Sequence, residues 1–198
     1  FVFEGIPDGV GLRPSGACGQ VEVYVNHEQS TVPFQNARDF VDSSVSRLTL
    51  ETRGGARQGS VLDASVAIDP SAGFLRFCSA FMGGPAEGLD SYVFFTGEET
   101  DDIVTVPAGA PYGPDPGLAA NQRQGGYAVV LDTDTGEYVT VPGLGRMNHE
   151  NTVVVPGGWS QVVAVSGDDT FSAPSAQMYM YVAASADGQR EALALIKS

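Results

Sequence analysis

The apolar residues of this chain occur in short runs, and turn-forming residues separate each run from the next. The runs are rich in Val, Thr, Tyr and Phe, and most of the 25 glycines and 12 prolines lie between them. Helical periodicity does not persist over about three turns anywhere, although residues 189–197 are compatible with a short helix. The pattern predicts an all-β protein with many short strands.

The clearest hairpin covers residues 127–141, where Gly136 lies in the turn between two apolar runs. The Gly/Pro-rich residues 1–20 predict either a loop or an edge strand over residues 1–3, followed by a turn at Pro7-Asp8-Gly9. Residues 101–126, rich in Pro, Gly and Asp, predict a long excursion between strands. The other expected strands are residues 21–28, 44–52, 61–68, 74–82, 91–96, 152–155, 161–165, 178–183 and 192–196, with a polar loop over residues 29–43.

The charge of the chain excludes some partners. The formal net charge is −14, which leaves no basic face for nucleic acid and repels anionic membrane surfaces. No apolar run approaches the roughly 18 residues of a membrane span, so membrane insertion is not expected. The 198 residues, 42% of them apolar, can form one core, and we expect a single domain over residues 1–198. The chain opens at Phe1 without a signal peptide, which predicts a processed mature chain or a fragment of a longer protein.

Two cysteines, Cys18 and Cys78, leave three interpretations open. They could form one disulfide in an oxidising compartment, Cys78 could be a buried thiol, or Cys78 could bind a metal.

Four polar tripeptides border the apolar runs: three of them end a run, and the fourth, Asn148-His149-Glu150, leads into one. Asn26-His27-Glu28 and Asn148-His149-Glu150 contain the only two histidines, and Gly97-Glu98-Glu99 and Gly167-Asp168-Asp169 are acidic doublets. Each is by itself typical of a polar turn. Because strand ends on a rigid scaffold often hold ligands, their recurrence predicts that carboxylates and imidazoles converge on one cation site.

The recurrence of these strand-end tripeptides favours a β-propeller over the alternative, a β-sandwich. Repeated blades around an axis bring equivalent strand ends to one central channel, whereas a sandwich gives no reason for a repeat. With about four strands to a blade the chain supplies about two to three blades, fewer than the four or more of a closed ring. We therefore expect further blades or a partner chain to complete the ring.

The order of these motifs resembles that of PhoX-type alkaline phosphatases and their uncharacterised relatives. The resemblance spans about residues 5–183 and rests on residues 25–28, 44–48, 97–99, 145–150 and 166–169. It implies a secreted, periplasmic or cell-surface propeller whose axial site binds calcium and iron and hydrolyses phosphate monoesters.

The resemblance also implies roles for individual residues. Arg146 would contact phosphate and His149 would lie at or beside the metals, both as catalytic groups. The family pattern has a cysteine directly before the glutamate pair as an iron ligand, but here that position is Gly97, so Cys78 can replace it only if the fold brings it to the axis. The implied metal ligands are Glu28, Glu98 or Glu99, Glu150, Asp168 or Asp169, and His27.

The same chemistry follows from the residue types. Calcium takes about six to eight oxygen ligands, and closely packed carboxylates are costly without a cation. The planar fork of Arg146 suits phosphate oxygens, although Arg146 could equally pair with a carboxylate. No serine-hydrolase elbow, phosphate-binding Gly-Lys-Ser/Thr loop or His-Glu-x-x-His motif is present. Two functions stay open: a metal-dependent phosphate-ester hydrolase, and a non-catalytic propeller in which calcium only joins the blades.

Overall fold

A computed structural model describes residues 5–28, 42–157, 160–170 and 176–183, which contain thirteen β-strands and three short 3₁₀ helices. The expected strands over residues 1–3 and 192–196, the possible helix over 189–197 and most of the loop over 29–43 lie outside the described residues. No helix in these described ranges is long and apolar enough to cross a membrane.

The first sheet, which we call blade 1, is an antiparallel meander of four strands in the order β1-β2-β3-β4. Residues 15–19 join β1 to β2, and the longer segment 52–60 joins β3 to β4. The strands are β1 (Ile6–Pro14), β2 (Gln20–Glu28), β3 (Ser44–Glu51) and β4 (Val61–Ile68).

Blade 2 repeats this pattern with one interruption. Its strands pair in the order β5-β6-β9-β10, and the separate β7–β8 hairpin is inserted between β6 and β9. The insertion confirms the predicted excursion over residues 101–126. The strands are β5 (Phe77–Gly83), β6 (Val93–Glu98), β7 (Ile103–Thr105), β8 (Gln122–Gln124), β9 (Ala128–Asp132) and β10 (Tyr138–Thr140). The 3₁₀ helices Pro70–Ala72 and Pro85–Glu87 flank β5, and Pro142–Leu144 follows β10.

Blade 3 contains three strands in the described part of the chain, paired in the order β11-β12-β13. They are β11 (His149–Val154), β12 (Val163–Asp168) and β13 (Met178–Val182).

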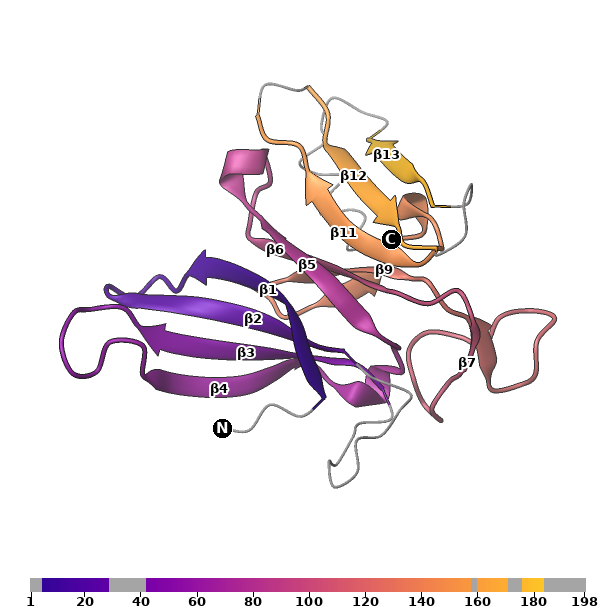
Figure 1. The fold of residues 1–198 in the computed structure, drawn as a ribbon, viewed down its shortest axis with the longest axis horizontal. Helices are drawn as coiled ribbons and strands as arrows, with labels where there is room; N and C mark the ends of the chain where they lie inside the picture. The colour runs from indigo at the N-terminus through magenta and orange to yellow at the C-terminus, as the bar shows by residue number, and fades with distance from the viewer. Residues whose placement is uncertain (1–4, 29–41, 158–159, 171–175, 184–198) are drawn as a thin grey trace.

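The three sheets are arranged as consecutive propeller blades. The first strand of each meander lies beside the first strand of the next, so that β1 contacts β5 and β5 contacts β11. The later strands of each blade lead away from this common line (Figure 1). This arrangement confirms the predicted all-β propeller, for which about two to three blades were expected, and the described residues form three.

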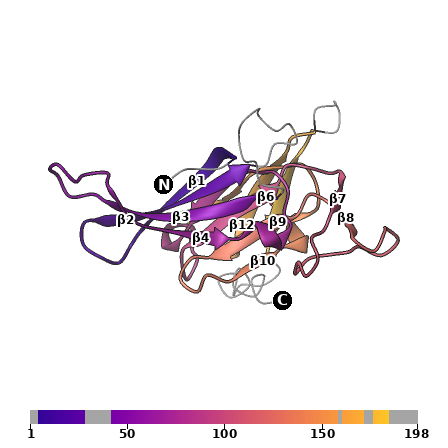
Figure 2. The same ribbon diagram turned by 90° about the horizontal axis from the view of Figure 1, so that it is seen from below.

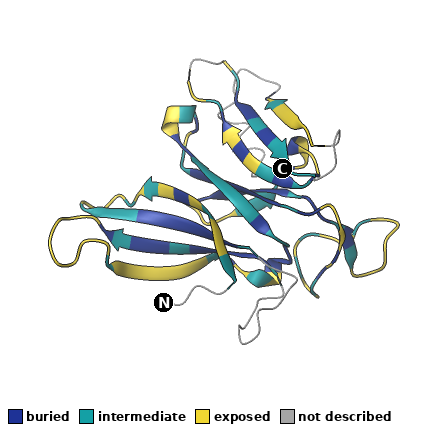
Figure 3. Ribbon diagram, viewed as in Figure 1, coloured by how far each residue is buried: buried dark blue, intermediate teal, exposed yellow. Residues whose placement is uncertain are grey.

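The two central strands of blade 2, β6 and β9, are buried at every position, so both of their faces are covered (Figure 3). Phe94, Val129 and Leu131 pack with blade 1 residues in one cluster. Their neighbours Phe95, Ala128 and Val130 point the opposite way and pack with blade 3. The alternation of side chains along a strand thus builds a separate hydrophobic layer on each side of one sheet.

The outward faces of the two flanking blades carry exposed apolar side chains (Figure 3). In blade 1 these include Val10, Leu12 and Val66, and in blade 3 they include Met178, Met180 and Val182. In a propeller such faces pack against neighbouring blades.

The structure corrects one prediction, the turn at Pro7-Asp8-Gly9, and it decides whether the two cysteines form a disulfide. The predicted turn at Pro7-Asp8-Gly9 is wrong, because these residues lie within β1 and form a bulge rather than a reversal of the chain. Cys18 and Cys78 are both free thiols. Cys18 lies in the β1–β2 turn and Cys78 at the opposite end of the sheets, so the disulfide interpretation is excluded.

Replacing Phe94 by Ala is expected to lower the free energy of unfolding by about 3–5 kcal/mol. Phe94 is fully buried and its ring stacks at 5.7 Å from that of Tyr24, so the substitution opens a cavity between blades 1 and 2. Urea denaturation measures the change. Leu12→Ala, at a position 57% exposed, is the control and should change stability by less than about 0.5 kcal/mol.

Candidate metal centre

The innermost strand of every blade has a β-bulge at the same place. In β1 two residues, Asp8 and Gly9, lie between the pairs formed by Pro7 and Val10. In β5 the two residues are Cys78 and Ser79, and in β11 they are Glu150 and Asn151. A bulge redirects the side chain of its first residue. Asp8, Cys78 and Glu150 therefore occupy equivalent positions in the three blades.

The second strand of every blade ends in an acid at an equivalent position. The residues paired with the start of the bulges are His27, Glu98 and Asp168. The residue that follows each of these in the sequence is an acid, namely Glu28 at the end of β2, Glu99 directly after β6 and Asp169 directly after β12. Because neighbouring side chains of a strand face opposite ways, only one member of each acidic doublet can face the axis.

The two copies of Asn-His-Glu consequently occupy different positions. Asn26-His27-Glu28 ends the second strand of blade 1 and corresponds to Gly97-Glu98-Glu99 and Gly167-Asp168-Asp169. Asn148-His149-Glu150 instead begins the innermost strand of blade 3. Blade repetition relates the acidic doublets to the first copy, but it does not relate the two copies to each other.

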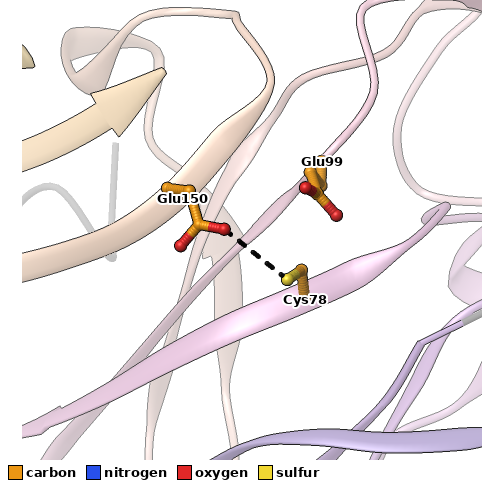
Figure 4. Close-up of side chains that lie close together, drawn as sticks. All are labelled: Cys78, Glu99 and Glu150. Carbon is orange, nitrogen blue, oxygen red and sulfur yellow. Dashed lines mark hydrogen bonds between the residues drawn. The ribbon is translucent and has the colours of Figure 1, made fainter. Parts of the chain in front are cut away.

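Three of the side chains from these positions, Cys78, Glu99 and Glu150, lie close together (Figure 4). Donor atoms of Cys78, Glu99 and Glu150 all lie within 4.8 Å of one another. The Cys78 thiol donates to Asp8 Oδ2 at 3.4 Å and to Glu150 Oε1 at 3.9 Å. Asp169 shares a hydrogen bond with Glu99, and Glu28 shares one with Asp8. We call these residues the axial cluster: Asp8, Glu28, Cys78, Glu99, Glu150 and Asp169.

Crowding changes the acidity of the axial cluster. Burial, the hydrogen bond to Asp169 and the charges of Glu28 and Asp169 raise the pKa of Glu99 to about 7. Burial and the charge of Asp8 raise the pKa of Glu28. Burial and the surrounding carboxylates also raise the pKa of the Cys78 thiol. The protein alone therefore holds protons in this cluster, and a bound cation would replace them.

Asn26 holds the Cys78 bulge in place from the neighbouring blade. Its side-chain amide donates to the carbonyl oxygens of Cys78 at 2.9 Å and Ser79 at 3.0 Å, and to Thr96 Oγ1 at 2.9 Å. Asn26 is fully buried, so these bonds form away from competing water. The bulge that presents Cys78 is thus part of the contact between blades 1 and 2.

Gly97 lies directly opposite the Cys78 bulge, and the packing there requires glycine. A Cβ added at Gly97 would lie 2.5 Å from the Cβ of His149 in the next blade. A cysteine cannot occupy this position without moving β11. The structure instead brings Cys78 to the axis, which was the condition for it to replace the cysteine of the family pattern.

Glu98 faces away from the axial cluster and has a structural role. Its carboxylate forms a fully buried ion pair with Arg123 and also accepts hydrogen bonds from the backbone N–H groups of Leu75 and Tyr127. The Arg123 guanidinium additionally donates to the carbonyl oxygen of Gly73 and lies over the ring of Tyr127. Of the predicted pair, Glu99 faces the axis and Glu98 anchors the strand behind it.

Both histidines are buried and hydrogen-bonded to serines. His27 Nε2 lies 2.7 Å from Ser46 Oγ, and His149 Nδ1 lies 3.2 Å from Ser166 Oγ. His149 Nε2 lies 3.2 Å from the carbonyl oxygen of Gly145, and burial lowers the pKa of His149. A neutral imidazole that donates through Nε2 and accepts through Nδ1 satisfies both contacts of His149.

Asp168 and Arg146 are also engaged locally. Asp168 Oδ1 accepts hydrogen bonds from the backbone N–H and the hydroxyl of Thr170. Arg146 pairs with Asp115 at 3.0 Å, and its guanidinium lies 4.0 Å from the centre of the Tyr127 ring. Arg146 thereby joins the β7–β8 insertion to the segment before β11.

The structure thus gathers Glu28, Glu99, Glu150 and Asp169 from the predicted set and adds Asp8 and Cys78. The sequence predicts a turn at Asp8, because the composition Pro-Asp-Gly is common in turns. The same residues also occur in bulges, as they do here. A basic residue, Arg76, lies beside this set, and its Nη1 donates to the carbonyl oxygen of Glu99 at 3.2 Å. No sequence pattern marked Arg76.

The donor set of the axial cluster fits the metals that the resemblance implies. Carboxylates from three blades suit a hard cation such as calcium, and a thiol among them adds affinity for a transition metal such as iron. Burial is the main cause of the raised pKa of Glu28 and Glu99, and the neighbouring carboxylates Asp8 and Asp169 raise these pKa values further.

A β-propeller with an acidic cluster at its axis is the class of protein that the fold and site define. Among solved structures, the chain is similar to Pseudomonas fluorescens PhoX in complex with vanadate, a transition state analogue, with a TM-score of 0.59 and 16% sequence identity. The match covers 98% of this chain and 44% of the PhoX chain, so this chain spans less than half the length of that protein. At this identity the likeness concerns the fold.

No family model matches the sequence. No curated protein matches it either.

Glu98→Gln and Glu99→Gln are expected to have opposite effects on the metal-free protein at pH 8. Glu98→Gln leaves the buried Arg123 without its charge partner and should lower the free energy of unfolding by about 3–5 kcal/mol. Glu99→Gln removes a crowded charge and should leave stability unchanged or raise it. Urea denaturation in a chelator compares the two, and equal losses would contradict the separate roles.

The metal-free protein should also lose stability as the pH rises. The folded-state pKa of Glu99, about 7, lies above its ordinary value of 4.5, so its contribution is present below pH 4.5 and is lost as the pH rises through 7. His149, with a lowered pKa, acts in the opposite direction. The measurement is therefore the difference in melting temperature between wild type and Glu99→Gln from pH 5 to 8, which should move steadily in favour of the variant.

Proposed function

We propose that this chain belongs to a metal-dependent phosphate-monoester hydrolase of PhoX-like type, with the axial cluster as its metal site. The observation that carries the proposal is the convergence of Cys78, Glu99 and Glu150 from two blades, with donor atoms within 4.8 Å. The fold likeness to PhoX, which binds vanadate as a transition state analogue, supports phosphate chemistry because vanadate mimics phosphate. A secreted, periplasmic or cell-surface location belongs to the same proposal.

The residues of the cluster divide by chemistry. Cys78, Glu99 and Glu150 would hold a transition metal such as iron, because they include the thiol. Asp8, Glu28 and Asp169 offer only oxygen and would hold calcium. Bound metals supply positive charge that polarises a phosphate ester and lowers the pKa of a water molecule.

The surrounding residues orient the ligands. Asn26 fixes the bulge that carries Cys78, and Glu98 with Arg123 fixes the backbone that carries Glu99. His149, bonded to Ser166 and Gly145, stands directly before Glu150 and holds the start of β11. These fixed partners keep the donor atoms preorganised, and outer contacts of this kind tune metal affinity.

A second function, a non-catalytic propeller in which calcium joins the blades, is favoured by one observation. The axial cluster draws two residues from each of the three blades, so a cation there would connect all of them. In that case the oxygen shell would be closed and no position would be left for a substrate.

Elemental analysis of the desalted protein tests the proposal. Wild type should contain calcium and iron near stoichiometry and hydrolyse p-nitrophenyl phosphate, whereas Glu150→Gln should lose the iron and at least about 100-fold in activity. Glu137→Gln, at an exposed turn, removes the same charge and is the matched control.

Calcium alone, with no hydrolysis, would favour the structural propeller. A protein that binds neither metal would overturn both functions.

A further inference from the structure

Arg76 adopts a backbone conformation that an arginine seldom takes. Its φ is +56°, and it is the only non-glycine residue with positive φ in the described part of the chain. Such conformations cost free energy and persist where the surrounding structure enforces them, often at functional sites. Arg76 lies immediately before β5, two residues from Cys78.

Arg76 is joined to the axial cluster through Glu99. The backbone N–H of Glu99 donates to the carbonyl oxygen of Arg76 at 2.9 Å, and Arg76 Nη1 donates to the carbonyl oxygen of Glu99 at 3.2 Å. The positive charge of Arg76 also acts on Glu28, where it opposes the rise in pKa. The guanidinium is therefore held at the edge of the axial cluster.

Among the other arginines of the described residues, all but one form an ion pair elsewhere. Arg57, in the β3–β4 turn, makes no ion pair, but this turn lies at the end of the molecule opposite the β7–β8 hairpin (Figures 1 and 2). The arginines with ion pairs among the described residues are Arg13, Arg47, Arg53, Arg123 and Arg146.

Arg76 keeps guanidinium capacity that its protein contacts do not use. Within the described residues it forms no ion pair, and one of its five N–H donors makes the hydrogen bond to Glu99. Its side chain is half-buried, so solvent or a ligand can reach it. A guanidinium fork binds two oxygens of a phosphate group at once.

We propose that Arg76, rather than Arg146, is the residue that binds the phosphate group of the substrate at the axial cluster. The inference rests on the proposed function, because acidic side chains would repel a phosphate unless metal ions neutralise them. With metals bound, Arg76 lies beside the cluster with free donors, whereas Arg146 is paired with Asp115 and stacked on Tyr127.

Calorimetric titration of the metal-loaded chain with inorganic phosphate tests the inference without requiring turnover. Arg76→Gln should weaken phosphate binding about 10- to 100-fold, as expected for loss of a charged hydrogen-bond donor, and should keep its metal content. Arg76→Lys keeps the positive charge but loses the planar fork, so its affinity for phosphate should lie between that of wild type and that of Arg76→Gln. Arg57→Gln, with the same change in net charge, should bind phosphate within about 2-fold of wild type.

Three other outcomes would overturn the inference in distinguishable ways. Wild-type phosphate affinity in Arg76→Gln would show that Arg76 does not bind phosphate, and it would leave the proposed function intact. Loss of metal from Arg76→Gln would make Arg76 a residue that positions Glu99. Wild-type protein that takes up metal but binds no phosphate would defeat the proposed hydrolase together with this inference.

Discussion

The buried ion pair of Glu98 and Arg123 connects blade 2 with its β7–β8 insertion directly behind Glu99 of the axial cluster. Glu98 ends β6, and its carboxylate accepts hydrogen bonds from the segment before β5, from the start of β9 and from β8. Burying two charges is unfavourable unless their donors and acceptors are matched, and here the carboxylate has four donors, although the buried Arg123 Nε has no hydrogen-bond partner among the described residues. The pair therefore ties the β7–β8 insertion to blade 2 and fixes the chain at Glu99.

Repetition of one backbone device in three blades explains how the cluster forms. In each innermost strand the bulge directly follows the residue that pairs with His27, Glu98 or Asp168. The residue that comes next in the sequence after each of these three is an acid. Side chains far apart in the sequence meet because the blades place these positions around one line. The cost is a concentration of negative charge, which appears as the raised pKa of Glu28 and Glu99.

Much of this could be predicted from the sequence, because strand-like runs and the acids after them are local signals. The all-β class, the hairpin around Gly136 and the convergence of Glu28, Glu99, Glu150 and Asp169 required only such signals. The choice between Glu98 and Glu99 depends on strand register, which is set by pairing with distant residues.

Other features had no local signal. The sequence Pro7-Asp8-Gly9 predicts a turn, although the residues form a bulge, because bulges and turns favour the same residue types. The two Asn-His-Glu copies look equivalent, but the order of strands within the blades separates them. Arg76 stands out only through its φ and its contacts, which no single-sequence pattern reports.

The equivalence of Asp8, Cys78 and Glu150 has a consequence for how such a site can diverge. One backbone position, repeated three times, carries an aspartate, a thiol and a glutamate while the bulge stays the same. A single substitution at one of these positions can exchange a hard donor for a soft one with little disturbance of the blade. Under the proposed function, the choice of ion would therefore depend on these three side chains and not on the sheets that carry them.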